Sequence, residues 1–219
     1  MVAVFGDVSE ADCFLCTAAH GDPDSVPWYD RPLIHEPGVG VAVSAVGAFV
    51  PGYVIVAPEM HTTSIRDLPR GARDEMLRLA QSARFQIEQI YGPSTIFEHG
   101  SCQWFEGRRS ACVAHSHIHV VPGKYGFDRL ALRFSVFESL EAMLAAADSR
   151  RGAGYLMYQE PGGAVYYAAD PGISQYFRRH IAAALGEDDE WDYAVVPRWD
   201  NVRATQLKFA EIRDRPANA

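Results

Sequence analysis

A run of alternating histidines is the feature that most constrains the fold of this chain. His115, His117 and His119 are separated by single residues and lead into Val120-Val121. Alternation with a period of two is typical of a β-strand, on which every second side chain lies on the same face. Three imidazoles on one strand face are costly to bury unless a metal ion, a phosphate or a hydrogen-bond network engages them. The pattern therefore predicts a strand over residues 113–121 whose imidazoles share one face and form a functional site, in preference to a solvated strand face.

The composition is that of an ordinary globular protein and excludes several functions. Of the 219 residues, 48% are hydrophobic and 22% are charged, which is enough apolar material for a sizeable core. A net charge of -8 argues against binding of a nucleic-acid polymer, which needs a basic surface. No apolar run reaches the roughly 18 residues of a membrane-spanning helix, and the first ten residues do not have the pattern of a secretory signal. With four cysteines in a chain of this length, we expect a reducing, cytoplasmic location and no membrane partner.

The order of apolar segments and turn residues predicts an α+β fold. An antiparallel meander is expected over residues 33–57, with turns at Pro37-Gly38 and Pro51-Gly52. A helix with apolar positions near a 3.6-residue period follows and ends at Gly92-Pro93. A short strand over residues 95–98 completes this part before the histidine strand.

After about residue 125 the pattern changes, and residues 125–219 are expected to form an α/β C-terminal extension of unknown role. The predicted elements are helices over 134–147, 173–185 and 201–213, a hairpin that turns at 161–163, and a strand over 191–196. The stretch that joins the two parts is too short for a free linker. We therefore expect the extension to pack on residues 1–124.

A second candidate site is the pair of cysteines near the start of the chain, Cys13 and Cys16. Two thiolates at this spacing chelate a tetrahedral metal ion, but they supply only half of its ligands. Histidines are the available partners, and His61 lies just beyond the predicted strand over residues 53–57. A redox role would need the strand-to-helix junction of a βαβ unit, which this segment lacks.

Taken together, these segments resemble the histidine triad (HIT) superfamily of nucleotide hydrolases and transferases. The family signature His-φ-His-φ-His-φ-φ, in which φ is apolar, is matched by residues 115–121, with a serine at the first φ. A family segment that ends in a histidine is matched loosely by residues 52–61, and the Cys-Ile-Phe-Cys start of zinc-containing members by residues 13–16. These matches follow one another in the family order over residues 12–122. The resemblance implies a HIT-like catalytic domain over residues 1–124, an antiparallel sheet with a packing helix.

The resemblance also implies roles for individual residues. It implies a structural zinc ion bound by Cys13, Cys16, His61 and His115. It places the nucleophile at His117, which would attack the α-phosphorus and form a nucleotidyl-histidine that water or another acceptor resolves. It assigns to His119, the second catalytic residue, a hydrogen bond to a phosphate oxygen.

Several residues near the triad depart from the family pattern or add charge to it, and we expect them to bind substrate. Glu98 and His99 stand where relatives have Asn-x-Gly, and Cys112 stands where relatives have a serine that helps to protonate or bind the leaving group. Arg108 and Arg109 precede the triad and could bind phosphates in a bidentate manner; a solvated surface pair is the alternative.

Two further positions bear on the substrate. The acidic residue that grips the ribose hydroxyls in relatives falls near Ala45, so this chain lacks it there. In the extension, Gln175, Arg178 and Arg179 recur at near-helical spacing and could add to a phosphate pocket from outside the HIT-like part. The alternative is an amphipathic helix that buries the neighbouring apolar side chains.

The sequence thus predicts an enzyme that cleaves a phosphoanhydride or phosphoramidate at the α-phosphate of a nucleotide or nucleotide conjugate. Hydrolysis and nucleotidyl transfer are both open, and zinc is the expected cofactor. The expected partners are that substrate and a second copy of the chain, because relatives commonly form homodimers. Two alternatives remain: a nucleotide-binding module without turnover, and a zinc-dependent hydrolase that uses the triad as an open three-histidine site.

Overall fold

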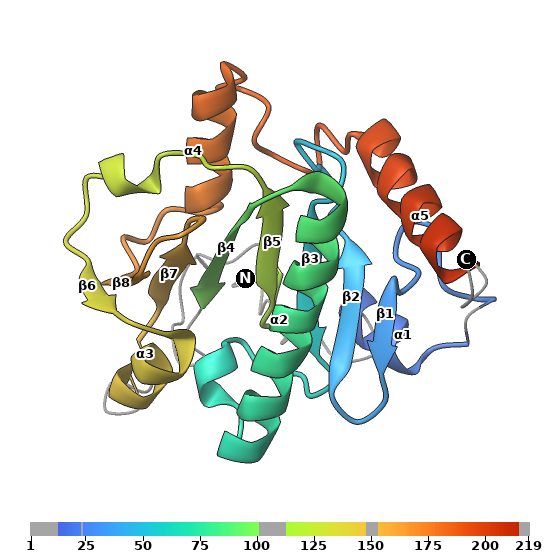
Figure 1. Ribbon diagram of the computed structural model, residues 1–219, viewed down its shortest axis with the longest axis horizontal. Helices are drawn as coiled ribbons and strands as arrows, with labels where there is room; N and C mark the ends of the chain where they lie inside the picture. Colours follow the sequence, from blue (N-terminus) through green and yellow to red (C-terminus); the bar gives the residue numbers. More distant parts are fainter. Residues whose placement is uncertain (1–12, 23, 101–112, 148–152, 215–219) are drawn as a thin grey trace, which may run out of the picture.

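The computed structural model describes residues 13–22, 24–100, 113–147 and 153–214. These residues form an eight-stranded antiparallel sheet with helices on both faces (Figure 1). In order across the sheet, the strands are β1 (Ile34–Glu36), β2 (Gly40–Ser44), β3 (Val54–Pro58), β5 (Ile118–Pro122), β4 (Ser94–Gly100), β7 (Tyr155–Gln159), β8 (Val165–Ala169) and β6 (Ser135–Phe137). The α+β class predicted from the sequence is confirmed.

Five α-helices and two short 3-10 helices accompany the sheet in the described ranges. They are α1 (Phe14–His20), η2 (Ile65–Asp67), α2 (Arg70–Tyr91), η3 (Phe127–Arg129), α3 (Leu140–Ala147), α4 (Tyr176–Leu185) and α5 (Trp199–Arg213). None of these helices combines the length and the apolar character that crossing a membrane requires. Figure 1 shows α2 lying across one face of the sheet and α5 beside its β1–β2 end.

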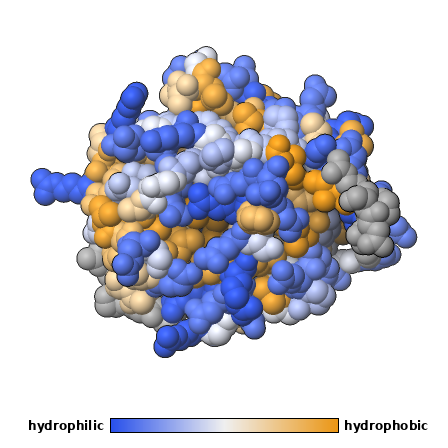
Figure 2. All heavy atoms as spheres, viewed as in Figure 1, coloured by the Kyte–Doolittle hydropathy of each residue, from blue (hydrophilic) through white to orange (hydrophobic). Residues whose placement is uncertain are grey.

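Two apolar cores flank the sheet, because successive residues of each strand point to opposite faces. On one face, Val56 and Ile118 pack against Met76 of α2. On the other face, the core joins Phe97 of β4 to Phe177 of α4 and also includes residues of α1. Figure 2 shows mainly hydrophilic side chains over the outer side of the face that carries α2, as an amphipathic surface helix requires. The sheet is therefore the middle layer of three.

Helix α2 ends where the sequence predicts. Gly92 has a φ of 84°, a left-handed conformation that costs little without a Cβ atom, and Pro93 cannot continue the helix. The chain then turns directly into β4, which pairs antiparallel with the histidine strand β5. This places Phe97 opposite His119 in the sheet.

The C-terminal extension continues the sheet of the first part. Strand β7 pairs with β4 from Ile96–Gln159 to Gly100–Tyr155, and β8 and β6 follow outward. The β4 edge is thus covered within the chain and is not open to a second copy. On the other side of the molecule, Asn201 of α5 donates hydrogen bonds to the carbonyls of Ala48 and Phe49 at 2.7 and 3.1 Å.

Some predicted elements of the extension are confirmed and two are wrong. The hairpin at 161–163 and the helices α4 and α5 are present. Residues 134–147 form a short strand and then a helix, because the Ser139 hydroxyl accepts a hydrogen bond from the Ala142 amide at 3.1 Å and so marks the helix start. Residues 191–196 turn instead of forming a strand, because the Asp192 carbonyl accepts hydrogen bonds from the Val195 and Val196 amides at 3.1 and 2.8 Å.

Because one sheet spans both parts, the chain should unfold in a single transition. Leu156 of β7 is fully buried, and we expect Leu156→Ala to lower the free energy of unfolding by about 2–5 kcal/mol. Leu207 of α5 is 60% exposed, and Leu207→Ala should change it by less than about 0.5 kcal/mol. Urea unfolding followed by circular dichroism and by tryptophan fluorescence measures both. Two separate transitions, with only one of them shifted by Leu156→Ala, would contradict the shared sheet.

Candidate functional site

Two histidines of the triad line a cavity on the face of the sheet that carries α1 and α4. The cavity has a volume of about 420 Å³, within the range of roughly 300–1,000 Å³ that is usual for small-molecule sites. His117 and His119 lie in its wall together with His99 of β4. The extension supplies much of the opposite wall through Gln175, Tyr176, Phe177, Arg178 and Tyr193. Both parts of the chain are needed to form this cavity.

The ring of His117 is held in one orientation by the backbone. Its Nδ1 lies 2.7 Å from the carbonyl oxygen of His115. A carbonyl only accepts, so Nδ1 carries the proton and Nε2 keeps its lone pair. Burial lowers the pKa of His117 below its usual value, which keeps the ring neutral. The side chain therefore presents an unprotonated nitrogen to the cavity.

His119 is held in the opposite tautomer by a tyrosine. The Tyr53 hydroxyl lies 2.8 Å from Nδ1 of His119, and burial raises the pKa of Tyr53 to about 12, so this hydroxyl stays protonated. Because it accepts a hydrogen bond from the Arg178 guanidinium, its own proton is directed to Nδ1 of His119. Burial also holds the pKa of His119 well below its usual value. The neutral ring then carries its proton on Nε2. Since the centroids of the His117 and His119 rings are 4.6 Å apart, a lone pair and an N–H donor lie side by side.

Arg178 brings a fixed positive charge to the same wall. It is 5% exposed, donates from Nη2 to the Gly47 carbonyl at 2.8 Å, and donates from Nε to the Trp191 carbonyl at 3.0 Å. Gly47 has a φ of 73°, and a Cβ there would lie 2.7 Å from Nη2 of Arg178, so the close approach requires glycine. A cation fixed in a largely apolar wall favours an anionic ligand.

The sequence left two alternatives for the helix that carries Arg178, a contribution to a phosphate pocket or an amphipathic helix. The structure shows features of both. Helix α4 is amphipathic and buries Phe177 and Ile181. Gln175 and Arg178 nevertheless line the cavity. Arg179 does not line the cavity. Its side chain is exposed, and its guanidinium lies 3.4 Å from the centroid of the Trp191 ring.

Sequence reasoning did not identify Asp30. This residue lies between α1 and β1, is 8% exposed and lines the cavity. Its carboxylate has no hydrogen bond or ion pair to any residue within the described ranges, and burial raises its pKa to about 6. No motif surrounds Asp30, so only the folded loop reveals its position in the cavity wall, which also includes Ala45.

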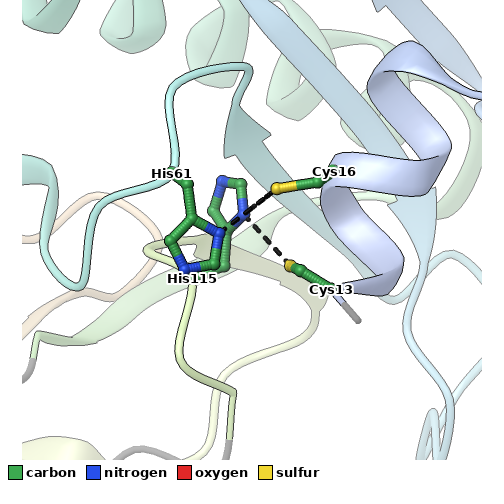
Figure 3. A group of neighbouring side chains, drawn as sticks. All are labelled: Cys13, Cys16, His61 and His115. Atoms are coloured by element: carbon green, nitrogen blue, oxygen red, sulfur yellow. Dashed lines mark hydrogen bonds between the residues drawn. The ribbon is translucent and has the colours of Figure 1, made fainter. Parts of the chain in front are cut away.

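A separate cluster joins the two cysteines to two histidines (Figure 3). Cys13 and Cys16 come from the start of α1, His61 from the loop after β3, and His115 from the segment before β5. Sγ of Cys13 lies 3.3 Å from Nδ1 of His115, and Sγ of Cys16 lies 3.2 Å from Nδ1 of His61. A tetrahedral ion with metal–sulfur and metal–nitrogen distances of about 2.3 and 2.0–2.1 Å would separate such atoms by about 3.6 Å. The four side chains therefore fit a metal ion.

The surroundings of His115 also suit a metal ligand. Its Nε2 lies 2.8 Å from the Pro58 carbonyl and must donate to it, which leaves Nδ1 unprotonated and facing the thiols. Burial lowers the pKa of His115 to about 4, so the ring is neutral, as metal binding requires. All four ligand atoms lie within 4.8 Å of one another, and a metal ion could bind among them.

The prediction that all three imidazoles share one strand face is wrong for His115. Strand β5 begins only at Ile118 because residues 113–115 bend, so the period-two pattern does not extend back to His115. Its ring turns to the cysteines, while His117 and His119 line the cavity. This division does not favour the alternative in which the triad forms one open three-histidine metal site.

The predicted substrate-binding residues fall into three groups. His99 lines the cavity. Glu98 points to the other face of β4, where it accepts hydrogen bonds from the Ile65 amide and the Tyr155 hydroxyl, and burial raises its pKa to about 7. Because neighbouring strand residues alternate between faces, the sheet separates Glu98 from the cavity. The remaining predicted residues, Cys112, Arg108 and Arg109, lie outside the described residues.

Comparison with known proteins gives a distant likeness. Two uncharacterized HIT-like proteins of Mycobacterium tuberculosis, from strains CDC 1551 / Oshkosh and ATCC 25618 / H37Rv, are each 25% identical to this chain over 121 residues. The alignment covers 55% of this chain and 76% of each relative. No family model matches the chain. The chain is therefore similar to HIT-like proteins over about half of its length, and a HIT-type function is the one this likeness suggests.

Removal of one thiol should abolish metal binding and weaken the fold. We expect the purified wild type to carry one metal ion per chain and Cys16→Ser to lose it and to unfold at a temperature lower by several degrees, because such an ion would link α1 to the sheet. Metal analysis and thermal unfolding measure the two effects. His20→Ala, which removes an exposed histidine from the same helix, is the control and should retain the metal. Full metal content in Cys16→Ser would argue against the cluster as a metal site.

Asp30 should reduce stability at neutral pH. Its pKa is raised from 3.8 to about 6, so the folded state holds the proton more tightly than the unfolded chain does. Stability from this group is therefore present at low pH and is lost as the pH rises through about 6. Asp30→Asn should raise the free energy of unfolding by about 1–3 kcal/mol at pH 7.5, and by much less at pH 4.5.

Urea unfolding at the two pH values measures this difference. The exposed Asp24→Asn is the control and should leave the free energy of unfolding unchanged at both. Equal stability of Asp30→Asn and the wild type at pH 7.5 would show that the Asp30 carboxylate is well solvated or paired.

Proposed function

We propose that this chain is a HIT-like enzyme that cleaves a phosphoanhydride or phosphoramidate bond at the α-phosphate of a nucleotide or nucleotide conjugate. The observation that carries the proposal is the hydrogen bond between Nδ1 of His117 and the His115 carbonyl, at 2.7 Å, which leaves Nε2 as a nucleophile in the cavity. The distant likeness to HIT-like proteins supports the same assignment.

The side chains of the cavity fit a covalent mechanism. Nε2 of His117 attacks the α-phosphorus, the bond to the leaving group breaks, and a nucleotidyl-histidine forms. The Nε2–H group of His119 and the guanidinium of Arg178 stabilise the negative charge on the phosphoryl oxygens. Water or another acceptor then attacks phosphorus and restores neutral His117. The nature of that acceptor separates a hydrolase from a nucleotidyltransferase.

The other groups in the wall suit the nucleoside part of the substrate. Tyr29, Tyr176 and Tyr193 line the cavity and offer ring faces to a base. Asp30 offers a carboxylate to sugar hydroxyls from the wall of the same cavity, which Ala45 also lines. The substrate is thus a single nucleotide or its conjugate and not a nucleic-acid polymer, in keeping with the net charge of -8.

We further propose that the metal is zinc and that its role is structural. Two thiolates and two imidazoles complete a tetrahedral set and leave no open position for substrate. The ion would hold Cys13 and Cys16 of α1 against the segment before β5. Since the carbonyl of the ligand His115 also orients His117, the metal site would fix the backbone that supports the nucleophile.

Adenosine, guanosine, cytidine and uridine 5′-phosphoramidates test the proposal. We expect the wild type to release nucleoside monophosphate and His117→Ala to lose at least about 10³-fold in kcat, because the nucleophile is removed. Mass spectrometry of acid-quenched wild type should show one added nucleotidyl group. His35→Ala removes an exposed histidine of β1 and should retain full activity.

The outcomes separate the alternatives. Nucleotide binding by folded, metal-loaded protein without any product would favour a binding module. Equal turnover by the wild type and His117→Ala would disprove the role of His117.

A further inference from the structure

One titratable side chain in the cavity wall has no part in the mechanism above. His99 projects from β4, on the same face of the sheet as Phe97 two residues before it. The Phe97 ring stacks on His119, with the two centroids 4.3 Å apart and the planes at 13°. His99 lies one step further along this face, and its side chain is only 9% exposed.

The pairing of β4 with β5 brings His99 to the cavity that holds the nucleophile candidate. Strands β4 and β5 pair antiparallel, with Phe97 opposite His119. His99 lies two residues beyond Phe97, toward the side from which the chain enters β5 at His117, and both histidines line the same cavity. A group that leaves the phosphorus attacked by His117 therefore departs into the cavity that His99 borders.

The extension holds the His99 ring. Oδ1 of Asp170, just after β8, lies 3.0 Å from Nε2 of His99 and accepts the Gly172 amide at 2.8 Å. A carboxylate only accepts, so Nε2 of His99 carries a proton and Nδ1 is the nitrogen left for the cavity. The Asp170 side chain is 12% exposed, which strengthens its interaction with an imidazolium. This histidine–carboxylate pair is built for proton transfer at Nδ1.

We propose that His99, positioned by Asp170, donates a proton to the leaving group of the reaction at His117. The inference rests on the proposed function. As Nε2 of His117 forms its bond to phosphorus, the bond from phosphorus to the leaving nitrogen or oxygen breaks, and that atom takes the proton from Nδ1 of imidazolium His99. His99 is then neutral and keeps its proton on Nε2. In the second step Nδ1 takes a proton from the attacking water or acceptor, which restores the imidazolium.

The role predicts that cleavage depends on His99 only when the leaving group is a poor one. An alkylamine must be protonated to depart from phosphorus, whereas p-nitrophenolate departs as an anion. The wild type should therefore cleave both kinds of substrate, and only the first should depend on His99. The extension would thus determine which bonds the enzyme breaks, because it supplies the partner of His99.

The experiment compares two substrates of the same nucleoside, an alkyl phosphoramidate and a p-nitrophenyl phosphodiester. His99→Gln should lose about 10²–10⁴-fold in kcat/KM on the phosphoramidate and less than about tenfold on the p-nitrophenyl substrate. Asp170→Asn should show a smaller loss with the same selectivity, because it acts through His99. The control His35→Gln should leave both reactions unchanged.

The possible results are distinct. Equal losses on both substrates would overturn the inference and indicate a binding or structural role, and so would unchanged activity of His99→Gln on the phosphoramidate. If His99→Gln fails to fold, as judged by circular dichroism, Asp170→Asn replaces it in the test. Its loss in kcat/KM on the phosphoramidate is then compared with its loss on the p-nitrophenyl substrate. If the wild type cleaves neither substrate, the proposed function fails first, and this inference fails with it.

Discussion

The imidazole of His115 is the point on which the rest of the site depends. One ring nitrogen donates to the Pro58 carbonyl at the end of β3, and the other faces the thiols of Cys13 and Cys16. Its own carbonyl accepts the proton of His117 Nδ1. A single residue therefore connects the sheet, the N-terminal helix and the nucleophile candidate. A shift of the His115 backbone would change the direction in which Nε2 of His117 points.

Residues from both parts of the chain form the cavity, because one sheet joins the two parts. Strand β5 and the segment before it supply His119 and His117, β4 supplies His99, and the extension supplies Arg178 and Asp170 around them. Charges of both signs are present: a fixed guanidinium lies near His119, and a carboxylate holds the ring of His99. Such an arrangement suits a phosphoryl group whose charge is redistributed as one bond forms and another breaks.

Much of the fold and of the metal cluster could be predicted from the sequence, because the signals are local. Period-two alternation and Pro-Gly turns placed the central strands, and the apolar period and Gly92 placed α2. The cluster of Cys13, Cys16, His61 and His115 is assembled as the resemblance to HIT proteins implies. Local signals misled where hydrogen bonds of single side chains or carbonyls redirect the chain, as at Ser139 and Asp192.

The rest of the site could not be predicted, because it depends on contacts between distant segments. Asp30 and Asp170 stand in no motif, and their positions follow from a loop and from the pairing of β7 with β4. Glu98 and His99 are neighbours in sequence, and only the face of the strand decides that one belongs to the core and the other to the cavity. Both were expected to bind substrate, and the period-two pattern used for the histidines fails at His115, because the chain bends before β5 begins.

The pairing of β7 with β4 has an evolutionary consequence. When two identical copies of a chain form a site across a shared sheet edge, every mutation appears on both sides of the symmetry axis. Here the strand that covers the edge belongs to the same chain and has its own sequence. The two walls of the cavity can therefore change independently, so that substrate recognition on one side can diverge while the histidine strand on the other side is preserved.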